Sequence, residues 1–314
     1  MNAPLDPAVA AESIEFTLDG QPMKARVGET IIQAAARQGV DIPHLCYKDG
    51  YRPDGNCRAC VVEIEGERVL APSCCRAPTP GMKVKAESER AVKAQKMVVE
   101  LLLSDMPEKT YKPDSELAYW AGKLGVTDSR FEAREQPPCD ESHPAMSVNL
   151  DACIQCNRCV RACREEQVND VIGYALRGAD SKIVFDLDDP MAESTCVACG
   201  ECVQACPTGA LSPKTHIGPQ AVDRKVDSVC PFCGVGCLIT YNVRDEKIIS
   251  VEGRDGPANH GRLCVKGRFG FYYAHHPDRL TVPLIRKPGV PKEVRPYGAD
   301  WRDTFREATW DEAL

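Results

Sequence analysis

Apolar residues occupy every second position over residues 14–18 and again over residues 23–27, close to the start of the chain. This period of two is typical of strands that bury one face. Asp19 and Gly20 lie between the two stretches and form a strong turn signal, so the pattern predicts a β-hairpin.

The same region continues with a helix signal and a second alternating stretch. Thr30 is a good N-cap for a helix through Arg37, and Gly39 is a common terminator. Residues 61–71 alternate again around Gly66, which predicts a second hairpin. Two strands, a helix, a loop and two more strands indicate a small α+β domain.

The last residues, TWDEAL, have the form of a helix start. Thr309 can accept a hydrogen bond from the first free N–H groups, and Glu312 can return one, as in a capping box. Only Ala313 and Leu314 follow. We therefore expect a helix, and a larger domain, to continue beyond Leu314.

The composition argues against several classes of function. The net charge is −7 and the basic residues are dispersed, which argues against a nucleic-acid partner. The N-terminus carries two prolines and an acid where a signal peptide needs an apolar run. The apolar stretch 97–103 includes Glu100 and is too short to span a bilayer. We expect a cytoplasmic protein that does not enter a membrane.

Cysteine is the unusual feature, with 18 residues of this type in 314. Such a content in a cytosolic chain indicates metal binding rather than disulfides. The residues fall into four groups, and the two central groups repeat the spacing C-x2-C-x2-C-x3-C. Their overlapping pairs cannot all form disulfides. For the first and fourth groups taken alone, a zinc site is an alternative.

The first group has gaps of ten, two and thirteen residues and lies in the loop of the small α+β domain. Element order and spacing together resemble the β-grasp [2Fe–2S] domain of complex I's large peripheral subunit, iron-only hydrogenases and NAD-linked formate dehydrogenases. Cys75 adjoins the last ligand and could replace it, but spacing favours Cys74. The ligands that the resemblance implies are Cys46, Cys57, Cys60 and Cys74.

The doubled run resembles bacterial two-cluster ferredoxins, in which the fourth cysteine of each run crosses to the other cluster. Pro207 follows the second run as in that family, whereas Arg164 replaces the proline after the first. The resemblance implies one [4Fe–4S] cluster on Cys153, Cys156, Cys159 and Cys206. It implies a second on Cys163, Cys196, Cys199 and Cys202.

The fourth group, CPFCGVGC followed 26 residues later by another cysteine, brackets a predicted hairpin at LITYNV and KIISVEG. It resembles the N-terminal [4Fe–4S] domain of molybdenum or tungsten bis-pyranopterin oxidoreductases. Lys266 matches that family's lysine between cluster and pterin, which implies an electron relay. The implied ligands are Cys230, Cys233, Cys237 and Cys264.

The order of these regions resembles the α (catalytic) subunit of soluble NAD-dependent molybdenum or tungsten formate dehydrogenases. The implied fold class is α+β, with four regions. They are a β-grasp [2Fe–2S] domain (12–85), a helix and linker (86–147), a two-[4Fe–4S] ferredoxin-like domain (148–222) and a truncated start of the molybdopterin oxidoreductase [4Fe–4S] domain (223–314).

This resemblance also implies a function. The family oxidises formate to CO2 at a Mo- or W-bis(pyranopterin guanine dinucleotide) centre and passes electrons through one [2Fe–2S] and three [4Fe–4S] clusters. The acceptors are FMN and NAD on diaphorase-type partner subunits. No catalytic residue can be assigned in this chain, because the resemblance places the chemistry in a C-terminal catalytic domain that is missing here. The chain itself would be the electron conduit.

Two alternatives stay open: a complex I-type peripheral arm subunit and a freestanding multi-cluster electron carrier. The complex I relatives carry a His-x3-Cys-x2-Cys-x5-Cys segment after a helix that corresponds to residues 88–104. Here that segment has neither His nor Cys, and a helix from Ser115 to Leu124, ending at Gly125, is predicted instead. The absent segment and the retained Lys266 count against a complex I-type subunit.

Two cysteines are left over, Cys75 and Cys139. We expect them to be small buried apolar residues, as unassigned cysteines usually are. His143 lies four residues after Cys139, but nothing in the pattern supports a metal role for it.

Overall fold

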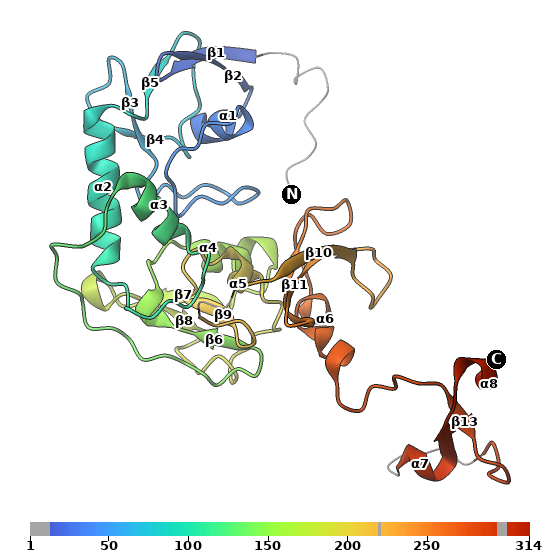
Figure 1. Ribbon diagram of the computed structural model, residues 1–314. Coiled ribbons are helices and arrows are strands. Elements are labelled where there is room, and N and C mark those ends of the chain that lie inside the picture. Colours follow the sequence, from blue (N-terminus) through green and yellow to red (C-terminus); the bar gives the residue numbers. More distant parts are fainter. Residues whose placement is uncertain (1–12, 219–220, 294–299) are drawn as a thin grey trace. The chain divides into compact units, whose positions relative to one another are not determined.

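The computed structural model describes residues 13–218, 221–293 and 300–314 (Figure 1). Residue 12, where the first domain is predicted to begin, lies outside the described residues. The chain divides into two compact units, one ending at Phe269 and the other spanning Gly270–Leu314.

The first sheet has five strands in the order β2-β1-β5-β3-β4. β1 pairs in parallel with β5, whereas the other neighbours are antiparallel, and helix α1 packs against β2. A mixed sheet with one helix is the β-grasp arrangement that the element order predicts. The elements are β1 (Ser13–Leu18), β2 (Gln21–Arg26), α1 (Ile31–Arg37), β3 (Val61–Ile64), β4 (Ala71–Pro72) and β5 (Lys83–Lys85).

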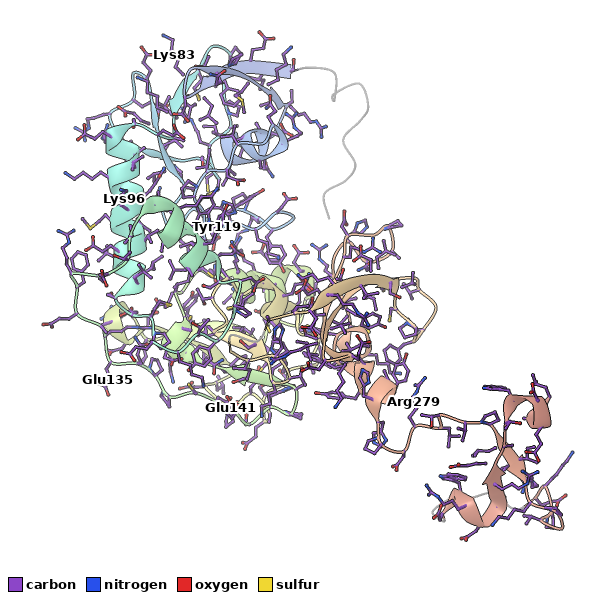
Figure 2. All side chains as sticks on the ribbon, in the orientation of Figure 1. Lys83, Lys96, Tyr119, Glu135, Glu141 and Arg279 are labelled. Carbon is purple, nitrogen blue, oxygen red and sulfur yellow. The ribbon has the colours of Figure 1, made fainter. Side chains whose placement is uncertain are left out.

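Alternation explains the predicted strands and also the strand that was missed. Phe16 and Leu18 in β1 face the core beside Met23 and Ala25 in β2, so the first predicted hairpin is confirmed. β5 was not predicted because it has only one inward residue. Val84 is buried, while Lys83, labelled in Figure 2, is exposed.

Helices α2 (Glu89–Leu103) and α3 (Glu116–Leu124) follow the sheet, as predicted. Ser88 and Ser115 cap their N-termini, and Gly125 ends α3 in the left-handed conformation. The two helices and the first cysteine loop share a small core that includes Leu45, Val99 and Trp120. None of the helices in the described part of the chain is long and apolar enough to cross a membrane.

The central region is held by β6 (Met146–Val148), which pairs antiparallel with β9 (Leu211–Pro213). Two short helices, α4 (Arg158–Arg161) and α5 (Glu201–Ala205), lie between these strands in the sequence. An antiparallel hairpin, β7 (Ile172–Ala175) and β8 (Lys182–Phe185), lies in the segment between the two cysteine runs. That segment was expected only as an insertion.

A three-stranded sheet contains β10 (Arg224–Val229), β11 (Leu238–Arg244) and β12 (Lys247–Gly253) in that order. β11 and β12 form the predicted hairpin. Helix α6 (Val265–Phe269) packs against β12 and ends the first unit.

The second unit is small. It contains η5 (Gly270–His275), β13 (Leu284–Arg286), α7 (Trp301–Thr304), β14 (Phe305–Glu307) and α8 (Trp310–Ala313), and β13 pairs antiparallel with β14. Thr309 accepts a hydrogen bond from the N–H of Glu312, so half of the predicted capping box is present. The Glu312 carboxylate instead accepts a hydrogen bond from Arg306, a stronger charge-assisted partner than the backbone N–H of Thr309.

Candidate iron–sulfur sites

The structure brings the four cysteines of the first group together at the edge of the β-grasp sheet. Cys46, Cys57 and Cys60 belong to the loop between α1 and β3, and Cys74 follows β4. The Cys46 N–H donates to the Sγ of Cys57 at 3.3 Å. Hydrogen bonds from the Cys57 and Cys74 thiols lower the pKa of Cys46, so the Cys46 sulfur lies within reach of both of these side chains.

The leftover Cys75 is exposed, in contrast to the expectation for it. Its Sγ lies 3.6 Å from that of Cys74, whose side chain occupies the interior position at 0% exposure. Both residues lie in the turn after β4, where the N–H of Cys75 donates to the Pro72 carbonyl at 3.0 Å, and this turn buries the Cys74 side chain while leaving that of Cys75 at the surface. A Cβ at Gly55 would approach the Cys75 Sγ to 2.8 Å, so the first cysteine loop passes close to this sulfur.

Cys139 is also exposed, so the second leftover cysteine was predicted wrongly as well. Its Sγ lies 3.8 Å from a carboxylate oxygen of Asp151, a polar contact that suits a surface position. His143 is buried, and its Nδ1 accepts hydrogen bonds from the N–H groups of Ala145 and Met146. These bonds give the imidazole a structural role in the turn before β6.

The doubled run folds as a backbone repeat with an offset of 43 residues. Gln155 and Ala198 have φ values of 54° and 53°, and Asn157 and Gly200 have φ values of 66° and 69°. Left-handed residues between successive cysteines bend the chain so that neighbouring thiols point to one side. Each run ends with a short helix, α4 or α5, that carries the third cysteine, and the fourth cysteine follows the helix within two residues.

The fourth cysteine of the second run lies with the first run. A small pocket is lined by Cys153, Cys156, Cys159 and Cys206 together. Burial raises the pKa of Cys156 to about 12, with Arg158 acting in the opposite direction and Cys206 in the same one. The pairing that the ferredoxin resemblance implies for Cys206 is therefore present in the fold.

The reciprocal arrangement holds for Cys163. Burial raises the pKa of Cys202 well above its usual value, and the neighbouring Cys199, Cys196 and Cys163 thiols add to this effect. Cys163 also accepts a hydrogen bond from the N–H of Val171 at 3.3 Å. A cysteine 33 residues before Cys196 in the sequence thus faces the second set.

The fourth group is more open to solvent. Burial raises the pKa of Cys237, followed by the charges of Cys230, Cys233 and Cys264, so the four side chains are neighbours. Cys233 and Cys264 are nevertheless exposed, and the other two are half-buried. The Cys230 N–H donates to the Cys237 carbonyl at 2.9 Å and closes the loop. Lys266 is exposed on α6, two residues after Cys264.

Each of the four sets supplies four thiols, the number of ligands that an iron–sulfur cluster needs. A zinc ion needs four donors within about 2.3 Å of one point. Among residues 13–218, 221–293 and 300–314, no three His, Cys, Asp or Glu side chains converge closely enough to hold one ion. All 18 cysteines are free of disulfide bonds. Iron–sulfur clusters, which are held by four separate thiolates, fit this donor set.

Five residues around these sets were missed at the sequence level: Arg158, Arg161, Glu201, Gln204 and Arg268. All except Gln204 are buried, although charged side chains are rarely buried without a partner. Four of them occupy matching positions in the two cysteine runs, before and after the third cysteine. That correspondence was visible in the sequence.

Three family models match the chain in the predicted order. They are a "2Fe-2S iron-sulfur cluster binding domain" at residues 11–89, a "4Fe-4S dicluster domain" at residues 152–210 and a "Molybdopterin oxidoreductase Fe4S4 domain" at residues 223–276. The predicted fold class and order of regions are thereby confirmed.

Among curated relatives, an NADH-quinone oxidoreductase subunit of Rhizobium meliloti is 31% identical over 287 residues, covering 88% of this chain and 33% of that protein. The NADPH-Fe(3+) oxidoreductase subunit alpha of Geobacter sulfurreducens is 33% identical, covering 87% and 33%. A putative formate dehydrogenase, YrhE, of Bacillus subtilis is 28% identical, covering 96% and 34%.

A chain in the crystal structure of an NAD+-reducing [NiFe]-hydrogenase superposes with a TM-score of 0.62 at 29% identity, covering 68% of this chain and 92% of that one. The chain spans about a third of the length of the curated relatives described above. The chain carries, in order, regions that match a [2Fe–2S] domain, a 4Fe-4S dicluster domain and the Fe4S4 domain of molybdopterin oxidoreductases, and relatives of this chain are named as oxidoreductase subunits.

Proposed function

We propose that this chain is the electron-conducting part of the α subunit of an NAD-dependent formate dehydrogenase. The observation that carries the proposal is the order of four cysteine sets in one chain, the last of them followed by Lys266 on α6. Relatives named as putative formate dehydrogenases in Bacillus subtilis and Staphylococcus aureus each align with 96% of this chain. In this assignment, formate oxidation belongs to a molybdenum or tungsten pterin domain outside this segment.

The proposed ligands are the four sets that lie together in the fold. Three sets take the [4Fe–4S] form and the first takes the [2Fe–2S] form, with domains at 12–85, 86–147, 148–222 and 223–314. Bound clusters would accept and release single electrons. The chain's own contribution is to supply thiolates, exclude water from the first three sets and direct backbone N–H groups at sulfur, as Val171 does toward Cys163.

Lys266 is the proposed relay residue beside the fourth cysteine set, the set that is most open to solvent. Its side chain is exposed and stands two residues after the exposed Cys264. The positive charge of Lys266 would stabilise the negative charge that a neighbouring redox group gains on reduction. We propose that a pterin-bearing domain covers this side, and that FMN- and NAD-binding partner subunits accept electrons elsewhere on the assembly.

The first experiment tests cluster content. The chain, purified without oxygen, is expected to hold about 14 iron atoms and matching acid-labile sulfide, with EPR signals of one [2Fe–2S] and three [4Fe–4S] clusters after reduction. Stoichiometric zinc without sulfide would overturn the proposal.

The second experiment tests the substrate. In the complete enzyme, formate is expected to reduce the clusters, and NADH is expected to do so through the partner subunits. In the 314-residue chain alone, formate is expected to leave them oxidised, since the proposal places formate oxidation in a domain outside this segment. Formate oxidation by this chain alone would contradict the proposed location of the chemistry.

A complex I-type subunit is the second candidate, favoured by the relative in Rhizobium meliloti whose name places it in an NADH-quinone oxidoreductase. It predicts that the complete protein couples NADH oxidation to quinone and does not respond to formate. The two candidates are therefore separated by adding formate or a quinone to the NADH-reduced assembly.

A further inference from the structure

The two cysteine runs repeat their backbone but differ in the side chains that flank the third cysteine. The position before it is Arg158 in the first run and Glu201 in the second. The position two residues after it is Arg161 in the first run and Gln204 in the second. Arg158, Arg161 and Glu201 are each only 2% exposed, so their charges are buried and must be compensated.

In the first run, the compensating groups belong to the first cysteine loop and to α3. Both terminal nitrogens of Arg158 donate to the carboxylate of Glu116 at 2.7 Å, and one also donates to the carbonyl of Tyr47. Arg161 donates to the carbonyl of Cys46, itself a proposed ligand, at 2.5 Å. The cationic face of α4 thus binds the backbone of the first cluster loop.

In the second run, most of the compensating groups belong to α6 and the three-stranded sheet, and one more, the hydroxyl of Tyr51 in the first cysteine loop, donates to the Glu201 carboxylate at 3.0 Å. The carboxylate of Glu201 accepts a hydrogen bond from Arg268 at 3.0 Å. Gln204 accepts from Arg268 at 2.6 Å and from the Gly253 N–H at 3.0 Å. Arg268 also donates to the carbonyl of Cys199, another proposed ligand, at 3.0 Å. Here the helix of the run is anionic and the neighbour supplies the cation.

The residue immediately before Arg158 or Glu201 shows how tightly each run packs against its neighbouring segment. A Cβ at Gly200 would lie 2.3 Å from the Cδ of Arg268 and 2.8 Å from the ring of Phe269, so only glycine fits there. The matching residue in the first run, Asn157, has the same left-handed backbone, and its side-chain amide donates to Asp54. Corresponding positions in the two runs therefore contact different neighbours.

We propose that Arg158 and Glu201 are matched recognition positions of opposite charge, which select and orient the segments that bear the first and fourth cysteine sets. Exchanging the neighbours would bury like charges against each other, which is strongly unfavourable. The junction cations, Arg158 and Arg268, are positioning residues that also stabilise the added negative charge of a reduced cluster nearby. This proposal rests on the iron–sulfur function proposed above.

The test is an EPR-monitored redox titration of the cluster-loaded protein. Arg158→Gln is expected to lower the reduction potential of a cluster at the first set or at the Cys153 set, by about tenfold in the equilibrium constant, or about 59 mV for one electron. Arg268→Gln is expected to act in the same way on the Cys196 or Cys264 sets. The control, Arg164→Gln, removes an exposed arginine on the same segment as Arg158 and is expected to change none of them.

Equal shifts at all clusters, no shift in either variant, or a matching shift in the control would overturn the proposal. A single variant that loads no cluster is compared with its charge-neutral double, Arg158→Gln with Glu116→Gln or Arg268→Gln with Glu201→Gln. Removing both charges is expected to restore loading, because no buried charge is left unpaired. Continued failure of both doubles also overturns it. A wild-type protein without iron and sulfide would instead refute the underlying iron–sulfur function.

Discussion

The doubled cysteine run and the fourth cysteine set bind the same proposed kind of cluster but are built in different ways. Cys159 and Cys202 are 8% and 5% exposed, and they sit in the core that β6 and β9 close. Cys233 and Cys264 are exposed at one end of a three-stranded sheet. The comparison shows that this chain's own packing encloses the ferredoxin-like sets, whereas the fourth set depends on a loop and on α6.

The largest expected effect concerns the crossing ligands, which only the doubled run has. Cys206→Ala is expected to remove the cluster on Cys153, Cys156 and Cys159, with a loss of about four iron atoms per chain. Iron analysis and EPR of the reduced protein measure the loss. Cys139→Ala, an exposed cysteine outside the four sets, is the control and is expected to keep all signals. Full iron content in Cys206→Ala would show that the ligand does not cross.

The next effect separates the two regions by solvent access, which the surrounding shell controls. During treatment with an iron chelator and an alkylating agent, Cys233 and Cys264 are expected to be modified at least about tenfold sooner than Cys159 and Cys202. Mass spectrometry of samples taken over time measures the order. Simultaneous modification of all four would mean that the chain loses its clusters in one cooperative step, and that burial does not distinguish the regions.

A third prediction weakens the contact between the two regions. Arg268→Met leaves the Glu201 carboxylate buried without its cation, which is expected to cost about 3–5 kcal/mol in the free energy of unfolding. Denaturant unfolding of the loaded protein measures the change. The control, Arg164→Met, breaks an exposed pair with Asp170 and is expected to cost at most about 1 kcal/mol. Similar costs for both variants would remove the distinction between buried and exposed pairs.

The smallest effect concerns the helix that supports the first cysteine loop. Ser88 accepts a hydrogen bond from the N–H of Ala91 at 3.2 Å, so Ser88→Ala is expected to destabilise α2 by about 1 kcal/mol. Because α2 packs in the core that contains Cys57 and not against the fourth set, alkylation of Cys57 should accelerate and that of Cys233 should not. Ser104→Ala, at the other end of α2, is the control. Equal acceleration at Cys57 and Cys233 would contradict this separation.

Much of the fold followed from local pattern, because short strands and caps are encoded by neighbouring residues. The hairpin around Asp19-Gly20 and the helix between Ser115 and Gly125 are found where the sequence predicts them. Strand β5 was missed because a single inward residue, Val84, produces no period, and its parallel pairing with β1 joins distant segments. The leftover cysteines were misjudged because residue type alone does not reveal which way a side chain points.

The sequence by itself determined the cysteine spacings, their order along the chain and hence the kind of cofactor expected. Thiolate ligands must be close in the chain or in space, and C-x2-C spacing already brings two together. Only the tertiary structure decided how the regions are joined. In the sequence, Arg158 and Glu201 look like ordinary surface charges. In the fold, packing buries them and gives each a partner more than 40 residues away. A buried charge needs an oppositely charged or hydrogen-bonding neighbour, because leaving it unpaired inside the protein costs a large free energy.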